Sequence, residues 1–298
     1  MKTAFGSIAV LALGLSVFAA AACEAQDCDV TRETPDGGTE TTQGTCFKSL
    51  KTWSGNASSQ DVAYVAGGSV TIDSRNGSVR VEQGSAGTVK ATVTPFVTRA
   101  FDTPQSTIDA DLAQLHLNAG GDASLVTVAT TRDSGSPSTL GGNIVVSLPP
   151  EFDGELKIIQ DNGSVDVNFV GAATHLGIAS DNGACEFDAG STARTVDITC
   201  DNGDIKGTIP VPADAAGGKV SSGNGTVELG FGTGATPFNV SAQAMDGGTV
   251  TTTLGSACTE NAASESSKTV SCNGATSANP TYTITAAGTS LADVVLTF

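Results

Sequence analysis

Five copies of one short pattern, each centred on the dipeptide Asn-Gly, constrain this chain more than any other feature. Asn162, Asn182 and Asn202 are spaced by 20 residues, and Asn224 follows after 22; a further copy surrounds Asn76. A fixed period of this length is typical of stacked repeats, because each repeat covers the apolar side of its neighbour. We therefore expect a regular array and not a mixed globule.

Apolar and polar residues alternate on both sides of each Asn-Gly. In 155–169, Leu156 and Ile158 precede the dipeptide, and Val165 and Val167 follow it. Alternation with a period of two predicts β-strands with one buried face. Asn and Gly both tolerate the backbone conformations of tight turns, so the dipeptide is expected to connect two short strands.

Two all-β architectures fit this pattern. Asn-Gly could close the hairpins of an antiparallel meander or sandwich, since it is the strongest two-residue hairpin signal. It could also form the corner of a β-solenoid coil of roughly 20 residues. The constant spacing favours the solenoid, and the sandwich stays as the alternative. In a solenoid, one asparagine per coil would stack into a turn ladder made of Asn76, Asn162, Asn182, Asn202 and Asn224.

The rest of the chain divides by composition. Residues 1–22 are expected to be a signal peptide, 23–61 a tether or N-terminal cap, and 62–298 the β-repeat solenoid domain. An irregular insertion at 84–154 interrupts the repeat. The tail has strand-like runs, and a polar loop is expected between its last two cysteines. The runs are 238–244, 249–254, 281–286 and 291–298.

One short helix is expected, over 105–117. Ile108, Leu112 and Leu115 fall at helical spacing there. Ser106 or Thr107 is the expected N-cap, because a hydroxyl oxygen can accept a hydrogen bond from a free N–H of the first turn. We expect this helix to cover an edge or an end of the β-structure.

The N-terminus has the features of an export signal. Lys2 precedes an apolar stretch at 4–18, and a run of alanines leads to Cys23. This resembles the lipobox of bacterial lipoproteins, which implies diacylation of Cys23 and a membrane partner through that lipid anchor. Ala20 stands where the motif prefers Leu, so ordinary signal-peptidase cleavage is the alternative. The expected location is the envelope or outer surface of a bacterium, with a soluble periplasmic or secreted protein as the alternative.

The cysteines fit an oxidising compartment. Seven are present, and six remain if Cys23 carries lipid. Sequential pairing is the simplest of the fifteen connectivities of six cysteines. The disulfide candidates are Cys28 with Cys46, Cys185 with Cys200, and Cys258 with Cys272. For Cys185 and Cys200, adjacent coils could bring the two together, and two buried free thiols are the alternative.

The charge excludes one class of partner. The chain has 31 acidic and 14 basic residues, for a formal net charge of −17. Such a surface repels nucleic acid, because non-specific phosphate binding needs a basic surface. Nucleic-acid binding is therefore not expected.

No catalytic motif is recognisable, so we expect no catalytic residues and no enzymatic activity. The two histidines, His116 and His175, lie in no nucleophile, zinc or phosphate-loop pattern. Asp161, Asp181 and Asp201 recur at one repeat position. The first interpretation is that they accept hydrogen bonds from the turn backbone. The second is a metal site that binds calcium weakly; no other cofactor is expected. The third is a polysaccharide-active enzyme using stacked carboxylates as acid and base.

At the level of its repeats the chain resembles the DUF4097 adhesin-like family of β-strand-repeat proteins. The resemblance covers roughly 65–255, and the segments that carry it are SVTIDSRNGSVRV, ELKIIQDNGSVDV, HLGIASDNGACEF and TVDITCDNGDIKG. It implies a non-enzymatic role at the cell surface as a structural or interaction module, with a surface protein or a glycan as ligand. The family brings no catalytic residues to this chain.

Overall fold

The computed structural model describes residues 24–33, 39–190, 193–232, 234–288 and 292–298, with side chains from residue 49 onward except those of 262 and 263. The chain forms two compact units, 1–52 with 98–103, and 53–97 with 104–298. No helix in the described ranges has the length and apolar character of a membrane span.

The first unit is built around an antiparallel hairpin. Strand β1 (Glu24–Glu33) pairs with β2 (Thr39–Lys48) along its whole length. The segment 23–61 was expected to be a tether or an N-terminal cap, and the backbone of 24–33 and 39–48 forms a regular two-stranded ladder. The same unit contains the first residues of β3 (Leu50–Ser54), where the Thr52 and Thr98 hydroxyls lie 2.9 Å apart.

The second unit contains the remaining strands and the only described helix. Before the central repeats these are β4 (Ser58–Ala63), β5 (Ser69–Asn76), β6 (Val79–Gln83), β7 (Thr88–Ala100), α1 (Gln105–Leu112), β8 (Leu115–Asp122), β9 (Leu125–Arg132) and β10 (Gly141–Leu148). The central repeats are β11 (Glu155–Asn162), β12 (Val165–Val167), β13 (His175–Asn182), β14 (Cys185–Asp188), β15 (Thr195–Asn202), β16 (Ile205–Ile209), β17 (Gly217–Asn224) and β18 (Val227–Phe231). The tail forms β19 (Phe238–Ala244), β20 (Val250–Thr253), β21 (Cys258–Ala263), β22 (Ser267–Cys272), β23 (Thr281–Ala286) and β24 (Val294–Thr297).

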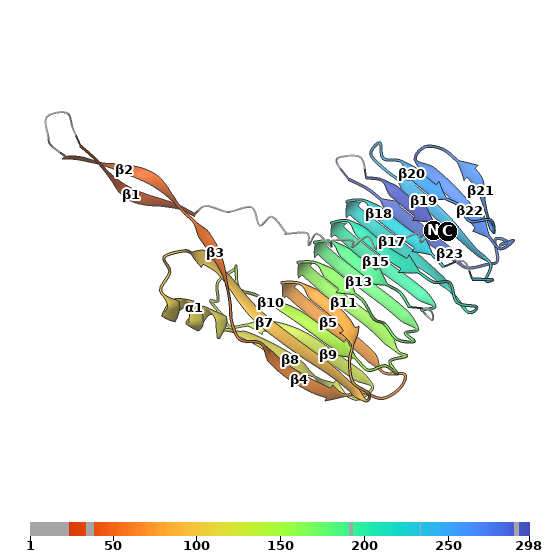
Figure 1. Ribbon diagram of the computed structural model, residues 1–298, viewed down its shortest axis with the longest axis horizontal. Coiled ribbons are helices and arrows are strands. Elements are labelled where there is room, and N and C mark those ends of the chain that lie inside the picture. Colours follow the sequence, from red (N-terminus) through yellow and green to blue (C-terminus); the bar gives the residue numbers. More distant parts are fainter. Residues whose placement is uncertain (1–23, 34–38, 191–192, 233, 289–291) are drawn as a thin grey trace, which may run out of the picture. The chain divides into compact units, whose positions relative to one another are not determined.

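Two mixed sheets enclose a single main core. Sheet I has the order β20-β24-β18-β16-β14-β12-β6-β10-β7, with β4 also paired to β7. Sheet II has the order β21-β22-β19-β23-β17-β15-β13-β11-β5-β9-β8. Each Asn-Gly repeat contributes one strand to each sheet, so the dipeptide turns the chain from sheet II into sheet I (Figure 1).

The repeats lie side by side as parallel strands in register. Strand β11 pairs with β13 so that Asn162 lies beside Asn182, 20 positions further on. Strands β13 and β15 repeat this step, and β15 and β17 continue it to Asn224. The upstream copy joins directly, because β5 pairs in parallel with β11 and places Asn76 beside Asn162. We call β5, β6 and β11 to β18 the repeat stack.

This arrangement confirms the all-β class with one short helix. The two packed sheets match the sandwich that the sequence left as the alternative, although strands within the repeat stack are parallel. A solenoid over the whole of 62–298 is not observed, because antiparallel pairs occur at both ends, as between β8 and β9 and between β19 and β22. The 20-residue period is absent from those segments, and local hairpins form instead.

Columns of apolar side chains run through the repeat stack. Their members occupy the same inward position of successive strands, where their side chains are fully or almost fully buried. One column consists of Ile72, Ile158, Ile178, Ile198, Val220 and Ile284. Burying one such side chain contributes roughly 1.5–3 kcal/mol, so the in-register column specifies the stacking as well as stabilising it.

The segment 84–154 extends both sheets and does not interrupt them. Strand β9 pairs in parallel with β5, and β10 pairs in parallel with β6. Strands β8 and β7 then add antiparallel to these. The free edge of β8 is covered by one side chain, since the Gln60 amide donates to the Leu117 carbonyl and accepts from the Ala119 N–H.

Helix α1 ends earlier than the sequence predicted. It stops at Leu112, and Leu115 begins β8. The N-cap is Pro104 with no side-chain cap hydrogen bond, so neither Ser106 nor Thr107 caps the helix. Residues 115–122 form a strand and do not continue the helix, because they pair with β9 along their whole length.

The C-terminal end of the core is closed by a hairpin and a group of rings. The polar loop expected between Cys258 and Cys272 is the antiparallel hairpin β21–β22. The rings of Phe231 and Phe238 pack with each other and with those of Tyr282 and Phe298, with centroids 5.3–6.3 Å apart. These bulky side chains belong to the part of the core that follows the repeat stack.

Candidate functional site

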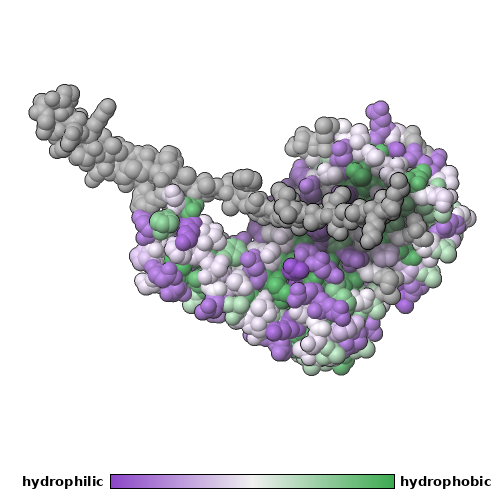
Figure 2. Space-filling model, in the orientation of Figure 1, coloured by the Kyte–Doolittle hydropathy of each residue, from purple (hydrophilic) through white to green (hydrophobic). Residues whose placement is uncertain are grey.

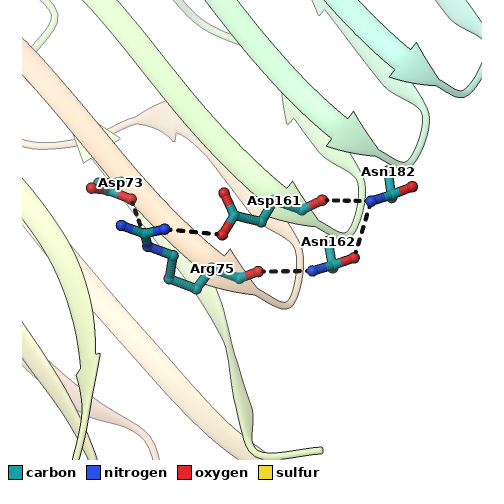
Figure 3. Close-up of polar contacts among 5 residues, drawn as sticks. All are labelled: Asp73, Arg75, Asp161, Asn162 and Asn182. Carbon is teal, nitrogen blue, oxygen red and sulfur yellow. Dashed lines mark hydrogen bonds and ion pairs between the residues drawn. The ribbon is translucent and has the colours of Figure 1, made fainter. Parts of the chain in front are cut away.

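Four of the five corner asparagines form a hydrogen-bonded ladder along the repeat stack. The fifth, Asn76, was expected to be part of it but donates to the Leu140 carbonyl at 3.1 Å instead. The Asn182 amide donates to Asn162 Oδ1 at 3.2 Å, and the Asn202 amide donates to Asn182 Oδ1 at 3.1 Å. Asn224 continues the row with a bond of 2.9 Å to Asn202. Figure 3 shows the beginning of the ladder, where Asn162 also bonds to the backbone of Arg75. These amides hold neighbouring coils together.

The glycine that follows each asparagine is required by the stacking. Gly183 has a φ of +140°, which side chains rarely adopt, and a Cβ there would collide with the Gly163 carbonyl. Its own N–H donates to the Asn202 carbonyl at 2.9 Å. The corner therefore selects Gly both for conformation and for the close approach of two backbones.

The three repeated aspartates point away from the core, and each has different surroundings. Asp161 accepts a hydrogen bond from Arg75 Nη1 at 3.2 Å, and Arg75 also lies 3.7 Å from Asp73 (Figure 3). This pairing raises the pKa of Arg75, chiefly through the hydrogen bond that its guanidinium donates to Asp161. Asp181 and Asp201 are exposed. Across the described residues, no group of three or more His, Cys, Asp or Glu side chains could hold a metal ion. Weak calcium binding by pairs of these carboxylates stays a prediction.

A buried polar row lies beside the asparagine ladder, and the sequence reasoning missed it. Ser74, Gln160, Ser180 and Ser222 stand two residues before each corner asparagine and face the core. Gln160 Nε2 donates to the carbonyl of Gly77, and Ser222 Oγ donates to that of Gly203. In each case the acceptor is the corner glycine of the preceding copy. The sequence did contain a signal for this row: these four polar residues stand at positions where the alternation predicts apolar ones.

Cys200 occupies this same position in its repeat and is bonded to Cys185. Their Cα atoms lie 6.6 Å apart, and both side chains are buried. The bond joins β14 of one coil in sheet I to β15 of the next coil in sheet II. The second disulfide joins Cys258 to Cys272 across β21 and β22, with Cα atoms 4.0 Å apart.

For three of the predicted site residues the structure describes no side chain. Cys23 falls before the described residues, so its lipidation is a prediction. The backbones of Cys28 and Cys46 belong to β1 and β2, where Cys28 lies opposite Gly44 and Cys46 lies opposite Gln26. Their side chains are not described, and a bond between them stays a prediction.

The histidines form carboxylate pairs that lack a nucleophile. His116 Nε2 lies 3.0 Å from Asp133, and His175 Nδ1 lies 4.0 Å from Asp197. His116 belongs to β8 and not to the helix on which it was expected. In the described part of the chain, neither histidine is hydrogen-bonded to a Ser, Thr or Cys side chain. The geometry therefore offers no acyl-transfer or phosphoryl-transfer site at either position.

The outer faces are shallow and mostly polar. Hydrophilic residues spread over the visible face, with hydrophobic ones in small areas between them (Figure 2). One depression of about 230 Å³ lies on sheet I among Asn168, Glu186, Asp188, Lys206 and Thr208. Charged side chains alternate along that face, where Arg80 lies 3.9 Å from Asp166 and Lys206 lies 3.8 Å from Glu228. Such surfaces suit contact with another surface better than enclosure of a small molecule.

Comparisons with known proteins find distant structural likeness only. No protein-family model matches the chain, and no curated protein matches it. A "putative cell adhesion protein" from Clostridium sporogenes superposes with a TM-score of 0.47 at 9% identity, covering 81% of this chain and 99% of that one. A "putative adhesin" from Bacteroides fragilis gives 0.36 at 9% identity, with coverages of 82% and 97%. Likeness at this level carries no argument about function, and the resemblance to DUF4097 stays a prediction.

Proposed function

We propose that this chain is a non-enzymatic, adhesin-like binding module that works outside the cytoplasm and is held at a bacterial envelope through lipid on Cys23. One observation carries the proposal: most of the polar and cysteine side chains that recur at the corners of the coils hold the repeat stack together. Four of the corner asparagines bond to one another, Asp161 is paired with Arg75, and Cys185 is bonded to Cys200. The strand faces remain as the extended surfaces for contact with a partner.

The disulfides support a location outside the cytoplasm. Disulfides persist in the periplasm and outside the cell, and reducing cytosol disfavours them. The bond between Cys185 and Cys200 lies in the core, so its formation is coupled to folding of the stack. A protein built this way suits an exported location, as the N-terminal sequence independently predicts.

The alternative of a polysaccharide-active enzyme has no observation in its favour. An acid and a base on neighbouring coils must both be free to reach the glycosidic bond. Asp161 is engaged with Arg75, while Asp181 and Asp201 are exposed on neighbouring coils. The single Trp, which could stack on a sugar ring, belongs to β3 and packs against the small second core, so it is not on the strands that carry these carboxylates. We therefore do not propose this activity.

Binding and catalysis can be separated in one experiment with purified 24–298. The protein is applied to arrays of glycans and bacterial or host surface proteins, and separately incubated with soluble polysaccharides while new reducing ends are measured. We expect retention on at least one class of surface without release of reducing ends. Accumulation of reducing ends that stops in an Asp181→Asn variant would overturn the proposal in favour of the enzyme.

The anchor has its own test in the producing bacterium. Cys23 supplies the thiol that would carry the lipid, and stable anchoring needs more than one acyl chain. We expect Cys23→Ser to move the protein from the membrane fraction to the soluble fraction, while Cys258→Ser leaves it in the membrane fraction. Equal partitioning of the Cys23→Ser variant and the wild type would remove the lipid anchor from the proposal.

A further inference from the structure

The C-terminal strands of sheet II present a face unlike the rest of this acidic protein. Strands β21, β22, β19 and β23 are consecutive in the sheet and lie together near the C-terminus (Figure 1). Among the residues whose side chains are described, the outward ones are every second residue of Asn239–Gln243, Ser267–Ser271 and Thr281–Thr285, together with Thr259 and Asn261. All of these are Ser, Thr, Asn or Gln. We call this surface the hydroxyl–amide face.

The contrast with the neighbouring strands of the same sheet is sharp. The outward positions of β5, β11, β13, β15 and β17 carry eight Asp, Glu or Lys residues as well as Arg75 and His175. They are Asp73, Glu155, Lys157, Asp161, Asp181, Asp197, Asp201 and Lys219. The two charged residues within β21 and β22, Glu260 and Lys268, fall at the opposite phase and pair with each other at 3.3 Å. An uncharged surface on a chain of net charge −17 is therefore local to these four strands.

The face is hydrogen-bonded across its strands and accessible to solvent. The Asn261 amide donates to Ser271 Oγ at 2.6 Å, and Ser271 Oγ donates to Asn239 Oδ1 at 2.8 Å, so one row is linked across three strands. Ser241 and Thr283 lie side by side in register and are both exposed. The disulfide between Cys258 and Cys272 ties the edge strand β21 to β22. The side chains thus form a fixed grid of hydroxyl and amide groups.

The chemistry of the hydroxyl–amide face indicates which class of ligand it can bind. Protein–protein interfaces need apolar and aromatic residues in their centre, and this face has none. The overall negative charge of the chain disfavours acidic polymers. A neutral polysaccharide presents hydroxyl groups that can donate to and accept from Ser, Thr, Asn and Gln side chains. We propose that the hydroxyl–amide face binds neutral glycan chains. This rests on the proposed binding function and names the surface and the ligand class.

Binding at one site is expected to be weak, because the face lacks an aromatic platform for a sugar ring. Many copies on one envelope would raise the overall avidity by about 10²–10⁴ without any new contact. A dense, lipid-anchored display is the setting in which such a surface would hold a cell to a glycan.

The test uses the full exported chain, 24–298, in gels containing dextran or galactomannan, and in parallel gels containing alginate or heparin. The face variant carries Ser241→Glu and Thr283→Glu. The control variant carries Ala179→Glu and Thr199→Glu, which are exposed outward positions of the same sheet on β13 and β15. Circular dichroism and intact disulfides establish that each variant is folded.

We expect at least one neutral polysaccharide to retard the wild type and the control, and the face variant to bind about tenfold more weakly. Equal retardation of both variants would contradict the assignment of glycan binding to the hydroxyl–amide face, while the proposed binding function would stand. If no neutral polysaccharide retards the wild type, the proposed ligand class is wrong; the proposed function still stands if the arrays show binding to a protein. If the wild type dimerises and the face variant does not, the proposal is also contradicted, because the face would then bind a second copy of the chain.

Discussion

At the scale of single residues, the asparagine ladder should contribute measurably to stability. Asn202 donates to the Asp181 carbonyl at 3.0 Å and to Asn182 Oδ1, and it accepts from Asn224. Removing these bonds by Asn202→Ala should lower the free energy of unfolding by about 1–3 kcal/mol. Urea unfolding measures this, with Asn168→Ala as the control, because Asn168 is exposed and lies outside the ladder. Equal stability of the two variants would show that the ladder has no energetic role.

The two tyrosines provide a matched pair at the same scale. Tyr282 is fully buried, its hydroxyl has no hydrogen-bond partner among the described residues, and burial raises its pKa to about 12. Tyr64 donates to Asp153 at 3.0 Å. We expect Tyr282→Phe to leave stability unchanged or to raise it by about 1 kcal/mol, and Tyr64→Phe to lower it by a similar amount. Thermal unfolding distinguishes the two, and a loss on Tyr282→Phe would reveal a hidden partner for that hydroxyl.

At the scale of the structural element, the repeat itself suggests how to replace a disulfide. The positions equivalent to Cys185 hold Val79, Val165, Ile205 and Val227, and those equivalent to Cys200 hold Ser74, Gln160, Ser180 and Ser222. Removing the bond should cost about 3 kcal/mol for its loop of 15 residues. Cys185→Val with Cys200→Ser should recover about 1–2 kcal/mol relative to the double Ala variant, because Val fills the site. Guanidinium unfolding midpoints test this order, and an equal loss in both would contradict the equivalence of the coils.

The stability of the C-terminal end of the sandwich should depend on pH. Glu260 Oε2 accepts from Thr252 Oγ1 at 2.7 Å and lies 3.3 Å from Lys268 Nζ, which links β20 of sheet I to β21 and β22 of sheet II. The Thr252 hydrogen bond, followed by Lys268, lowers the pKa of Glu260 below 4.5. A lowered carboxyl pKa stabilises the fold above the unfolded pKa, and that contribution is lost as pH falls through the folded pKa.

Glu260→Gln should therefore be less stable than the wild type at neutral pH, and the difference should shrink towards acid. Glu155→Gln is the control, because Glu155 is exposed and lies in none of the ion pairs described above. The measurement is the unfolding midpoint from about pH 7 to below pH 4.5. If the difference in unfolding midpoint between the wild type and Glu260→Gln grew as the pH fell, the lowered pKa of Glu260 would not be the source of its stabilising effect.

The elements show where sequence reasoning succeeds and where it fails. The Asn-Gly spacing predicted the corner and the register from Asn162 to Asn202, because a strict period acts on every copy alike. Two predictions were wrong: the end of the helix and the polar loop between Cys258 and Cys272. Both segments form strands instead, because they pair with partners that the local sequence does not reveal. The buried Ser and Gln row was missed because the alternation predicts apolar residues there. The glycine carbonyls that Gln160 and Ser222 meet are known only from the structure, and the hydroxyls of Ser74 and Ser180 have no partner among the described residues.

At the scale of the whole molecule, a stack of parallel coils forms the middle of both extended sheets. The stack explains why the chain needs few aromatic residues, because narrow columns of Ile, Leu and Val fill its interior. In the location that we propose, outside the cytoplasm, disulfides persist, so a cysteine can replace a core polar residue at position 200. The surfaces differ along one sheet, from charged on the repeat stack to uncharged on the hydroxyl–amide face.

One measurement tests the register of the stack and the compartment together. The protein is recovered from producing cells in acid with an alkylating agent, and its disulfides are mapped by mass spectrometry of non-reduced peptides. The account predicts bonded peptides joining Cys185 to Cys200 and Cys258 to Cys272. Alkylated, free Cys185 and Cys200, or a bond from either one to a different cysteine, would contradict it, because the coils would then be differently stacked or the chain would reside in a reducing compartment.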